Sequence, residues 1–267
     1  MKFVLTFLIF AIAVLANAQI PEAVFDYDFK NGKQNLLLHG NAKIKNNSLV
    51  LDGKSYAKIP DSGNIHLTEK GLTIGAMVRF APNQNGENPK LFDMILAKGK
   101  EYIFGKNKKN MYLNFNNGVN WCAVTIGGNA PAAGEWAFVS ATYKYFQDVA
   151  QGENGYILSI YVNGELEFQN KVFYLKPAQV KDDILIGSGF GGGPWLFKGE
   201  ISRIMLYDSV LSSAQIENLF KKVSAGKIRL KGIYPVNKKT AEKLEKLQKN
   251  ARSETASWLF TCFHNAL

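Results

Sequence analysis

The chain has 267 residues, a formal net charge of +10 at pH 7 and only two cysteines. So few cysteines exclude a disulfide-dense scaffold, and the length suits one domain of about 200 residues with an appendage. The positive charge is concentrated in residues 221–267, which carry eleven Lys and Arg against three Glu. Residues 19–220 hold twenty basic and nineteen acidic residues, and this near neutrality argues against specific nucleic-acid binding by that part.

The first 18 residues have the pattern of an export signal. Lys2 provides the positive start, and residues 3–16 form an apolar run in which Thr6 is the only polar residue. The tripeptide that ends at Ala18 has the small-x-small pattern of a signal peptidase site, so a mature start at Gln19 is predicted. Because the run is short for a membrane span, we expect a secreted protein, extracellular or periplasmic, with an uncleaved anchor as the alternative.

Residues 19–223 contain a succession of short strand patterns. Residues 72–80 alternate between two faces, and residues 136–143 and 158–162 repeat the alternation. In residues 136–143 both faces are partly apolar, as expected for a strand inside a sandwich. Long helices do not alternate with these strands, which predicts an all-β fold: a two-sheet antiparallel β-sandwich, or jelly roll.

Three glycine-containing dipeptides predict tight hairpin turns. They are Asp52-Gly53, Asn117-Gly118 and Asn163-Gly164, each placed between two strand patterns. Each dipeptide tolerates the positive φ angles that a two-residue hairpin requires.

The stretch from residue 199 to residue 220 predicts a closing strand and a short helix. Ser212 and Gln215 have the spacing of a capping box at the start of this helix. Ile216, Leu219 and Phe220 then form one apolar stripe, and the helix is expected to end near Val223.

Six sequence segments, in this order, resemble the laminin-G-like domains of the concanavalin A-like lectin/glucanase superfamily. They are VFDYDF (24–29), LVLDGKSYAKIP (49–60), GLTIGAMVRF (71–80), AGEWAFVSATY (133–143), LSIYVNGEL (158–166) and GEISRIMLYDSVLSSAQI (199–216). The resemblance implies the β-sandwich. Trp136 is expected to be a core anchor, because large aromatic residues dominate sandwich cores, with a sugar platform as the alternative. The superfamily includes carbohydrate-binding modules, adhesion domains, pentraxin-like proteins and glycoside hydrolases, so the fold does not name an activity.

The sequence lacks the patterns of the enzymes with this fold. Retaining glycosidases need two carboxylates about 5 Å apart, and the E-x-D-x-x-E strand of the related β-glucanases is absent. The arginine-rich strand and the Gln-x-His pair of the related alginate lyases are also missing, and the three histidines show no metal spacing. We expect no catalytic site, with a glycoside hydrolase or polysaccharide lyase as a distant alternative.

A calcium site is one candidate for chemistry. Many members of the superfamily hold calcium with carboxylates and carbonyls, the ligands that this hard cation prefers. Asp26 and Asp28 on the first strand and Asp208 after the last strand could converge, because the resemblance makes these terminal strands neighbours. The alternative is that Asp208 initiates a turn and the other two carboxylates are solvated.

Loop aromatic residues and amides are the candidates for ligand binding, because sugar rings stack on flat π surfaces. Trp195 follows a glycine-rich loop, Trp121 follows Asn117-Gly118, and Tyr145 and Phe146 lead into the polar insert QDVAQGENG. Asn116, Asn117 and Asn120 are expected to offer amide hydrogen bonds. Burial in the core is the alternative for Trp195 and Trp121.

Residues 224–267 are predicted to be a linker and a basic helical tail. Asn237 can cap a helix over residues 238–250, and the amphipathic pattern suits either packing on the sandwich or contact with a partner or an anionic surface. Cys122 and Cys262 could form a disulfide, although Cys122 also fits a plain buried position.

These expectations together describe a secreted, non-catalytic domain. Glycan binding is the first prediction and adhesion to an extracellular protein is the second. No membrane-spanning segment is expected after signal cleavage.

Overall fold

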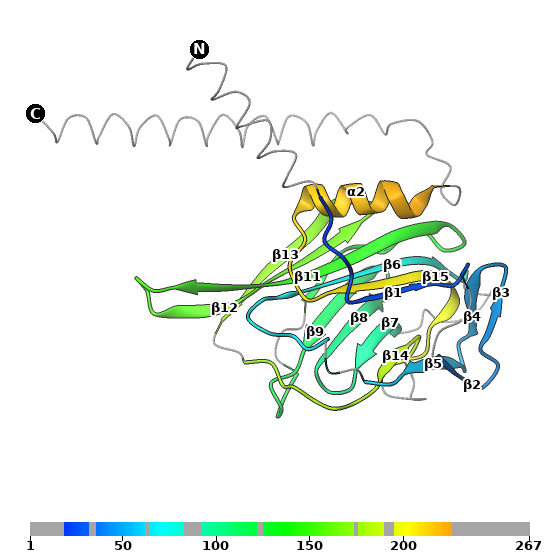
Figure 1. Ribbon diagram of the computed structural model, residues 1–267, viewed down its shortest axis with the longest axis horizontal. Coiled ribbons are helices and arrows are strands. Elements are labelled where there is room, and N and C mark those ends of the chain that lie inside the picture. The colour runs from blue at the N-terminus through cyan, green and yellow to red at the C-terminus, as the bar shows by residue number, and fades with distance from the viewer. Residues whose placement is uncertain are drawn as a thin grey trace, which may run out of the picture. The chain divides into compact units, whose positions relative to one another are not determined.

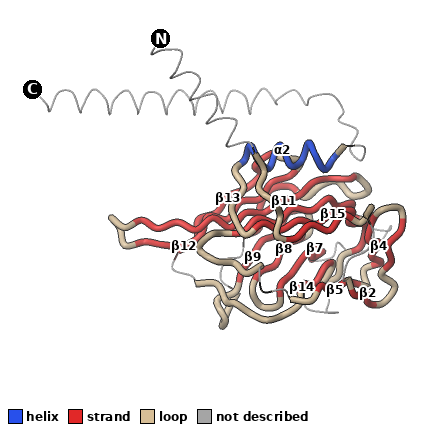
Figure 2. The backbone as a smooth tube through the Cα atoms, viewed as in Figure 1, coloured by secondary structure: helices blue, strands red, loops and turns tan. Residues whose placement is uncertain are grey.

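The computed structural model describes residues 19–31, 36–61, 63, 65–82, 92–121, 125–173, 176–189 and 195–225. Over these ranges the chain forms fifteen strands and one helix, and every strand pairing is antiparallel. The strands make two facing layers (Figure 1), and Figure 2 shows how much of this part of the chain is strand. The predicted two-sheet β-sandwich is confirmed.

The first sheet has eight strands. In spatial order they are β13 (Glu165–Phe173), β12 (Glu153–Val162), β11 (Trp136–Asp148), β6 (Leu72–Phe80), β15 (Lys198–Tyr207), β4 (Ser48–Asp52) and β3 (Lys43–Lys45). The eighth strand, β1 (Phe25–Asp28), pairs with the second half of β15, whereas β4 pairs with the first half. The closing strand therefore lies next to the opening strand, as the resemblance implied.

The second sheet has seven strands. In spatial order they are β10 (Thr125–Asn129), β9 (Asn110–Phe115), β8 (Tyr102–Asn107), β7 (Phe92–Lys98), β14 (Ile184–Ile186), β5 (Tyr56–Ile59) and β2 (Leu37–His39). The core lies between the two sheets, because successive side chains of a strand point to opposite faces. In β6, for example, Leu72, Ile74 and Val78 belong to this core.

The helix α2 (Ser213–Ser224) covers the outer face of the eight-stranded sheet beside β11 and β13 (Figure 1). Its capping box forms as predicted: the Ser212 hydroxyl accepts from the Gln215 backbone N–H, and the Gln215 side chain accepts from the Ser212 N–H. Ile216 and Leu219 are buried, and Phe220 stacks on Phe138 of β11 with ring centroids 6.3 Å apart. This cover explains the apolar character of both faces of β11.

The Asn163-Gly164 hairpin is confirmed as a two-residue turn. Val162 pairs with Glu165, and Asn163 and Gly164 have φ angles of 50° and 85°. Glycine is also needed here for space, because a Cβ on Gly164 would lie 3.2 Å from the Glu217 Cα of the helix.

The other two predicted hairpins are wrong in detail. Asp52-Gly53 joins β4 to β5, which belong to different sheets, so this turn carries the chain from one layer to the other. After β9 the chain does reverse, but the turn contains residues 117–120 and is closed by a bridge between Asn116 and Trp121. It is therefore a four-residue turn.

Trp136 is not the core anchor that was predicted. Its side chain is partly exposed, and the Arg79 guanidinium lies 5.3 Å from the ring centroid. The register explains this, since the next residue, Ala137, is the one that pairs with the core residue Val78.

Some predictions fall outside the described residues. They are the export signal, the helix at 238–250, and the pairing of Cys122 with Cys262. Within the described part of the chain, no helix is long and apolar enough to cross a membrane.

Candidate functional site

A groove of about 600 Å³ opens at one end of the sandwich; we call it the rim groove. Three segments that are distant in sequence line it: residues 67–70 before β6, the adjacent strands β11 and β12, and residues 176–179 before β14. This volume lies in the ordinary range for small-molecule sites.

Aromatic rings form the apolar part of the rim groove. Tyr145 of β11 and Tyr156 of β12 are directly paired across the two strands, with ring centroids 5.6 Å apart in an edge-to-face arrangement. Tyr156 is buried, and this burial raises the pKa of its hydroxyl, so the group stays protonated and neutral. Tyr145 is only partly buried and lines the groove.

Polar side chains complete the lining of the rim groove. Asn154 and Gln179 are exposed and bring amides that can donate and accept hydrogen bonds. Thr68 adds a hydroxyl, and Glu69, Lys70 and Lys176 add charges of both signs.

A second hollow of about 450 Å³ adjoins the rim groove, because both are lined by Thr68, Lys70 and Gln179. It is also lined by His66 and by Asp208, which is exposed. The two hollows together give an elongated surface at this end of the sheets, suited to a ligand longer than one ring.

The buried carboxylate of Glu101 joins the two loops that wall the groove. It accepts from His66 Nδ1 at 2.8 Å and from the Leu67 backbone N–H at 2.7 Å, both in the loop before β6. It also accepts from the backbone N–H of Val180, at 3.3 Å, in the segment before β14. Burial raises the pKa of this carboxyl from its ordinary value, and the hydrogen bonds oppose that effect.

A second buried charge strengthens the same region. The Lys98 side chain is fully buried, and its Nζ lies 2.7 Å from Asp61 Oδ1 and 3.1 Å from the Asp182 carbonyl oxygen. This pair lowers the pKa of Asp61. The two loops are thus tied to the end of β7 by Lys98 and to the turn after β7 by Glu101, so the groove walls are pre-formed.

Of the predicted ligand residues, Tyr145 lies in the rim groove and Phe146 does not. Adjacent residues of a strand point to opposite faces, and Phe146 lies on the outer face of the sheet. There it packs at 90° against Phe173 with centroids 5.7 Å apart, and Lys171 Nζ lies 4.3 Å from its ring centroid.

Trp121 and Trp195 come together elsewhere, on the outer face of the seven-stranded sheet. Both pack against a small buried cluster on this face that includes Met94 and Tyr112. The ring of Phe92 lies 4.6 Å from that of Trp195 and 5.0 Å from that of Tyr112. Both tryptophans are partly exposed, so they cover this cluster and are not in the main core.

The predicted asparagines build the turn between β9 and β10. Asn116 is buried and its side-chain oxygen accepts from the Gly118 N–H at 2.7 Å. The Asn117 side-chain oxygen accepts from the N–H groups of Val119 and Asn120 at 3.0 and 2.9 Å. The backbone of Asn116 also accepts from Ala178 N–H, so this turn braces a segment of the groove wall without lining it.

The predicted group of Asp26, Asp28 and Asp208 does not form. Arg203 binds Asp26 through two nitrogens, at 2.8 and 2.5 Å, and its third nitrogen lies 3.9 Å from Asp28. These carboxylates raise the pKa of Arg203. Among the described residues, no three His, Cys, Asp or Glu side chains are grouped as metal ligands. Calcium binding by this chain stays a prediction, and melting curves with calcium and with chelator test it.

Several groove residues were missed at the sequence level: Thr68, Glu69, Lys70, Lys176 and Gln179. Asn154 lies inside the polar insert after Phe146, so part of the signal was visible. Residues 61–70 and 176–183 carry no motif, and only the fold brings them together.

The comparisons with known proteins agree with the observed β-sandwich fold. A laminin G family model, described as the concanavalin A-like lectin/glucanases superfamily, matches residues 51–217, more than half of the chain. The chain belongs to this superfamily. No curated protein matches the chain.

Solved structures share the architecture at low sequence identity. One is domain 4 of AbnA, a GH43 extracellular arabinanase from Geobacillus stearothermophilus, in complex with arabinotriose; it has a TM-score of 0.53 and 16% identity, over 75% of this chain and 99% of that one. The receptor-binding domain of botulinum neurotoxin type G has a TM-score of 0.54 and 11% identity, over 76% of this chain and 52% of that one. This chain thus spans about half of that toxin domain. At these identities the likeness shows the fold alone.

Proposed function

We propose that this superfamily member is a secreted carbohydrate-binding protein without catalytic activity, and that the rim groove receives the glycan. The observation that carries the proposal is the juxtaposition of Tyr145 with Asn154 and Gln179 in one pre-formed groove. A sugar presents apolar C–H faces, which suit an aromatic ring, and hydroxyls, which pair with amides that both donate and accept.

The rigidity of the walls supports ligand binding in the groove. A ligand that enters a pre-formed groove does not have to order the loops, and this saving favours affinity. The arabinotriose held by the AbnA domain supports a glycan ligand for a sandwich of this kind. An extracellular protein partner is the alternative, and the aromatic outer face with Trp121 and Trp195 is where it would be tested.

A glycan array with the chain from Gln19 onward tests the proposal. Bound glycans are then titrated against Asn154→Ala and Gln179→Ala, two exposed positions whose truncation should leave the fold intact. Each lost hydrogen bond should weaken affinity by about three- to ten-fold. Tyr145→Ala should weaken it further, and a thermal melt separates lost stacking from lost stability.

Phe146→Ala is the matched control, since it removes an aromatic ring from the same strand but from the opposite face. The glycan affinity of this variant should equal that of the parent chain. The proposal fails if no glycan binds, or if only Trp195→Ala and Trp121→Ala weaken binding. Release of shorter sugars from a bound glycan would replace it with the hydrolase or lyase alternative.

A further inference from the structure

A row of side chains crosses the eight-stranded sheet at the end opposite to the rim groove. The strand registers align Trp136 of β11 with Arg79 of β6, Arg79 with Glu200 of β15, and Glu200 with Val50 of β4. Directly opposed residues share a face. Their neighbours Val78 and Ile201 are in the core, so this row points outward.

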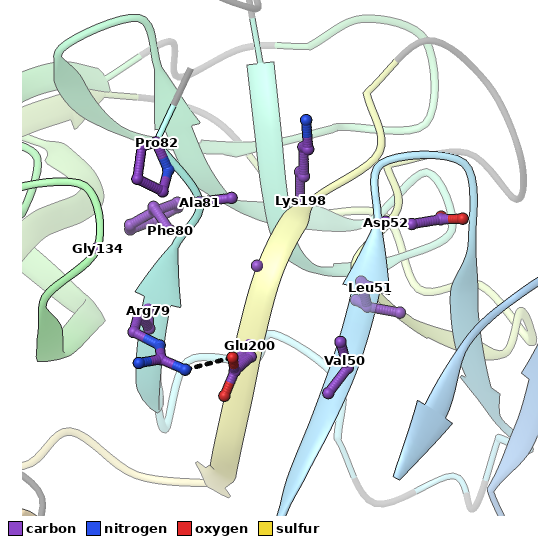
Figure 3. Close-up of a pocket in the computed structure, with 11 residues that line it drawn as sticks. Val50, Leu51, Asp52, Arg79, Phe80, Ala81, Pro82, Gly134, Lys198 and Glu200 are labelled. Atoms are coloured by element: carbon purple, nitrogen blue, oxygen red, sulfur yellow. Dashed lines mark hydrogen bonds and ion pairs between the residues drawn. The ribbon is translucent and has the colours of Figure 1, made fainter. Parts of the chain in front are cut away.

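Helix α2 stops short of this row. The helix packs on Phe138, which is two residues further along β11 than Trp136 and on the same face. Beyond that contact the sheet is hollowed: a cavity of about 420 Å³ lies over β4, β15 and β6, and we call it the sheet hollow. Figure 3 shows the ion pair between Arg79 and Glu200, with Lys198 further along the strand of Glu200 and Asp52 on the adjacent strand β4.

Arg79 is held from two sides and still reaches solvent. Its guanidinium forms an ion pair with Glu200 and lies over the Trp136 ring at 5.3 Å. The side chains of Arg79 and Glu200 remain 39% and 25% exposed. An arginine has five N–H donors in a rigid fork, so donors that Glu200 does not use are fixed beside a carboxylate acceptor.

The charges that line the sheet hollow balance. Arg79 and Lys198 are cationic, and Asp52 and Glu200 are anionic. Hydrogen bonds from the Ser55 hydroxyl and the Lys54 N–H lower the pKa of Asp52 to about 2, so it is ionised at physiological pH. A lining with both signs and no net charge does not select a strongly charged ligand. It suits a molecule whose groups donate and accept in turn.

We propose that the sheet hollow is a second glycan-binding site, independent of the rim groove, and that it takes neutral sugar units. A sugar hydroxyl can accept from Arg79 while it donates to Glu200, and Val50, Ala81 and Pro82, which also line the hollow and are not buried, offer apolar surface for the ring. Leu72 and Phe80 end the strand that joins the two sites, which places the sites about 26 Å apart at about 3.3 Å per residue. One protein would thus hold two segments of a glycan, or two glycans, at once.

The test uses the full chain from Gln19 and follows the indole N–H signal of Trp136 by NMR, assigned with Trp136→Phe. Arabinotriose and maltotriose serve as neutral probes and trigalacturonate as an anionic one. The Trp136 signal should move with a neutral probe, and Arg79→Ala should weaken that response at least ten-fold. Glu200→Gln should weaken it by a smaller factor, because the amide keeps the shape and loses the charge.

Arg203→Ala is the matched control. Like Arg79, Arg203 is an arginine bound to a carboxylate, but it lies on β15 and outside the hollow. This variant should leave the Trp136 response unchanged. Asn154→Ala should also leave it unchanged, so failure of the rim groove and failure of this site are distinguishable. A Trp136 signal that stays still with every probe, moves equally in Arg79→Ala, or responds best to trigalacturonate overturns the proposal.

Discussion

At the scale of single residues, Glu101 makes the stability of the groove walls depend on pH. Burial raises the pKa of this carboxyl above its ordinary value of 4.5. The folded state therefore binds the proton more tightly than the unfolded chain, so this contribution to the free energy of unfolding is full below pH 4.5 and is lost as pH rises through the folded pKa. We predict that Glu101→Gln removes this part of the pH dependence, as measured by urea unfolding from about pH 4 to about pH 7.

The same substitution should lower stability at neutral pH by about 2 kcal/mol, because one amide cannot accept from His66, Leu67 and Val180 together. Glu69→Gln is the control, as Glu69 is exposed on the groove and should leave both quantities nearly unchanged. An unchanged pH profile in Glu101→Gln would contradict the assignment.

Arg203 shows why the expected group of three carboxylates is not found among the described residues. Asp26 and Asp28 do share a strand face, as expected, but a guanidinium from the paired strand occupies the space between them. Arg203→Ala should lower the free energy of unfolding by about 1 kcal/mol, since the pair is partly exposed and two like charges are then left together. Restoring charge with Arg203→Lys should recover only part of the loss, because lysine cannot bind Asp26 through two nitrogens.

At the scale of elements, helix α2 depends on its cap. Ser212 and Gln215 satisfy two of the N–H groups that a helix start leaves unpaired. Ser212→Ala should cost about 1 kcal/mol in thermal or urea unfolding, and Ser212→Asp should recover most of it because aspartate is an equally good cap. Loss in both variants would mean that the hydroxyl acts by some route other than capping.

Local chemistry decided which elements were predictable. The cap and the Asn163-Gly164 turn depend on residues within four positions of one another, and both were predicted. The Asp52-Gly53 turn has the same local chemistry, yet the strands on its two sides pair with β15 and β14, more than a hundred residues away. A turn dipeptide predicts that the chain reverses, but it does not predict which strand each flanking strand will pair with.

At the scale of the whole molecule, the same limit governs the candidate site. The sequence indicated Tyr145 and the segment that contains Asn154, because the polar insert begins directly after Phe146. Lys70 and Gln179 share the groove only because Glu101, from a third segment, holds both loops. Hydrophobic alternation predicts the sheets, whereas a binding surface made from several loops follows from how the sheets stack.

Tyr143 couples the two sheets at this end of the sandwich. It is fully buried on β11, and its hydroxyl donates to the carbonyl oxygens of Asn114 and Ile103 in the facing sheet, at 3.3 and 3.5 Å. Tyr143→Phe should cost about 1 kcal/mol for the lost hydroxyl, and Tyr143→Ala about 3 to 5 kcal/mol because it also leaves a cavity.

Single-tryptophan chains that retain Trp136 or Trp195 report on the two sheets separately. In each protein, the parent chain and Tyr143→Phe, the two reporters should share one urea midpoint, because one shared core makes the sandwich a single cooperative unit. Separate midpoints for the two reporters would show that the sheets unfold independently and that this tyrosine does not couple them.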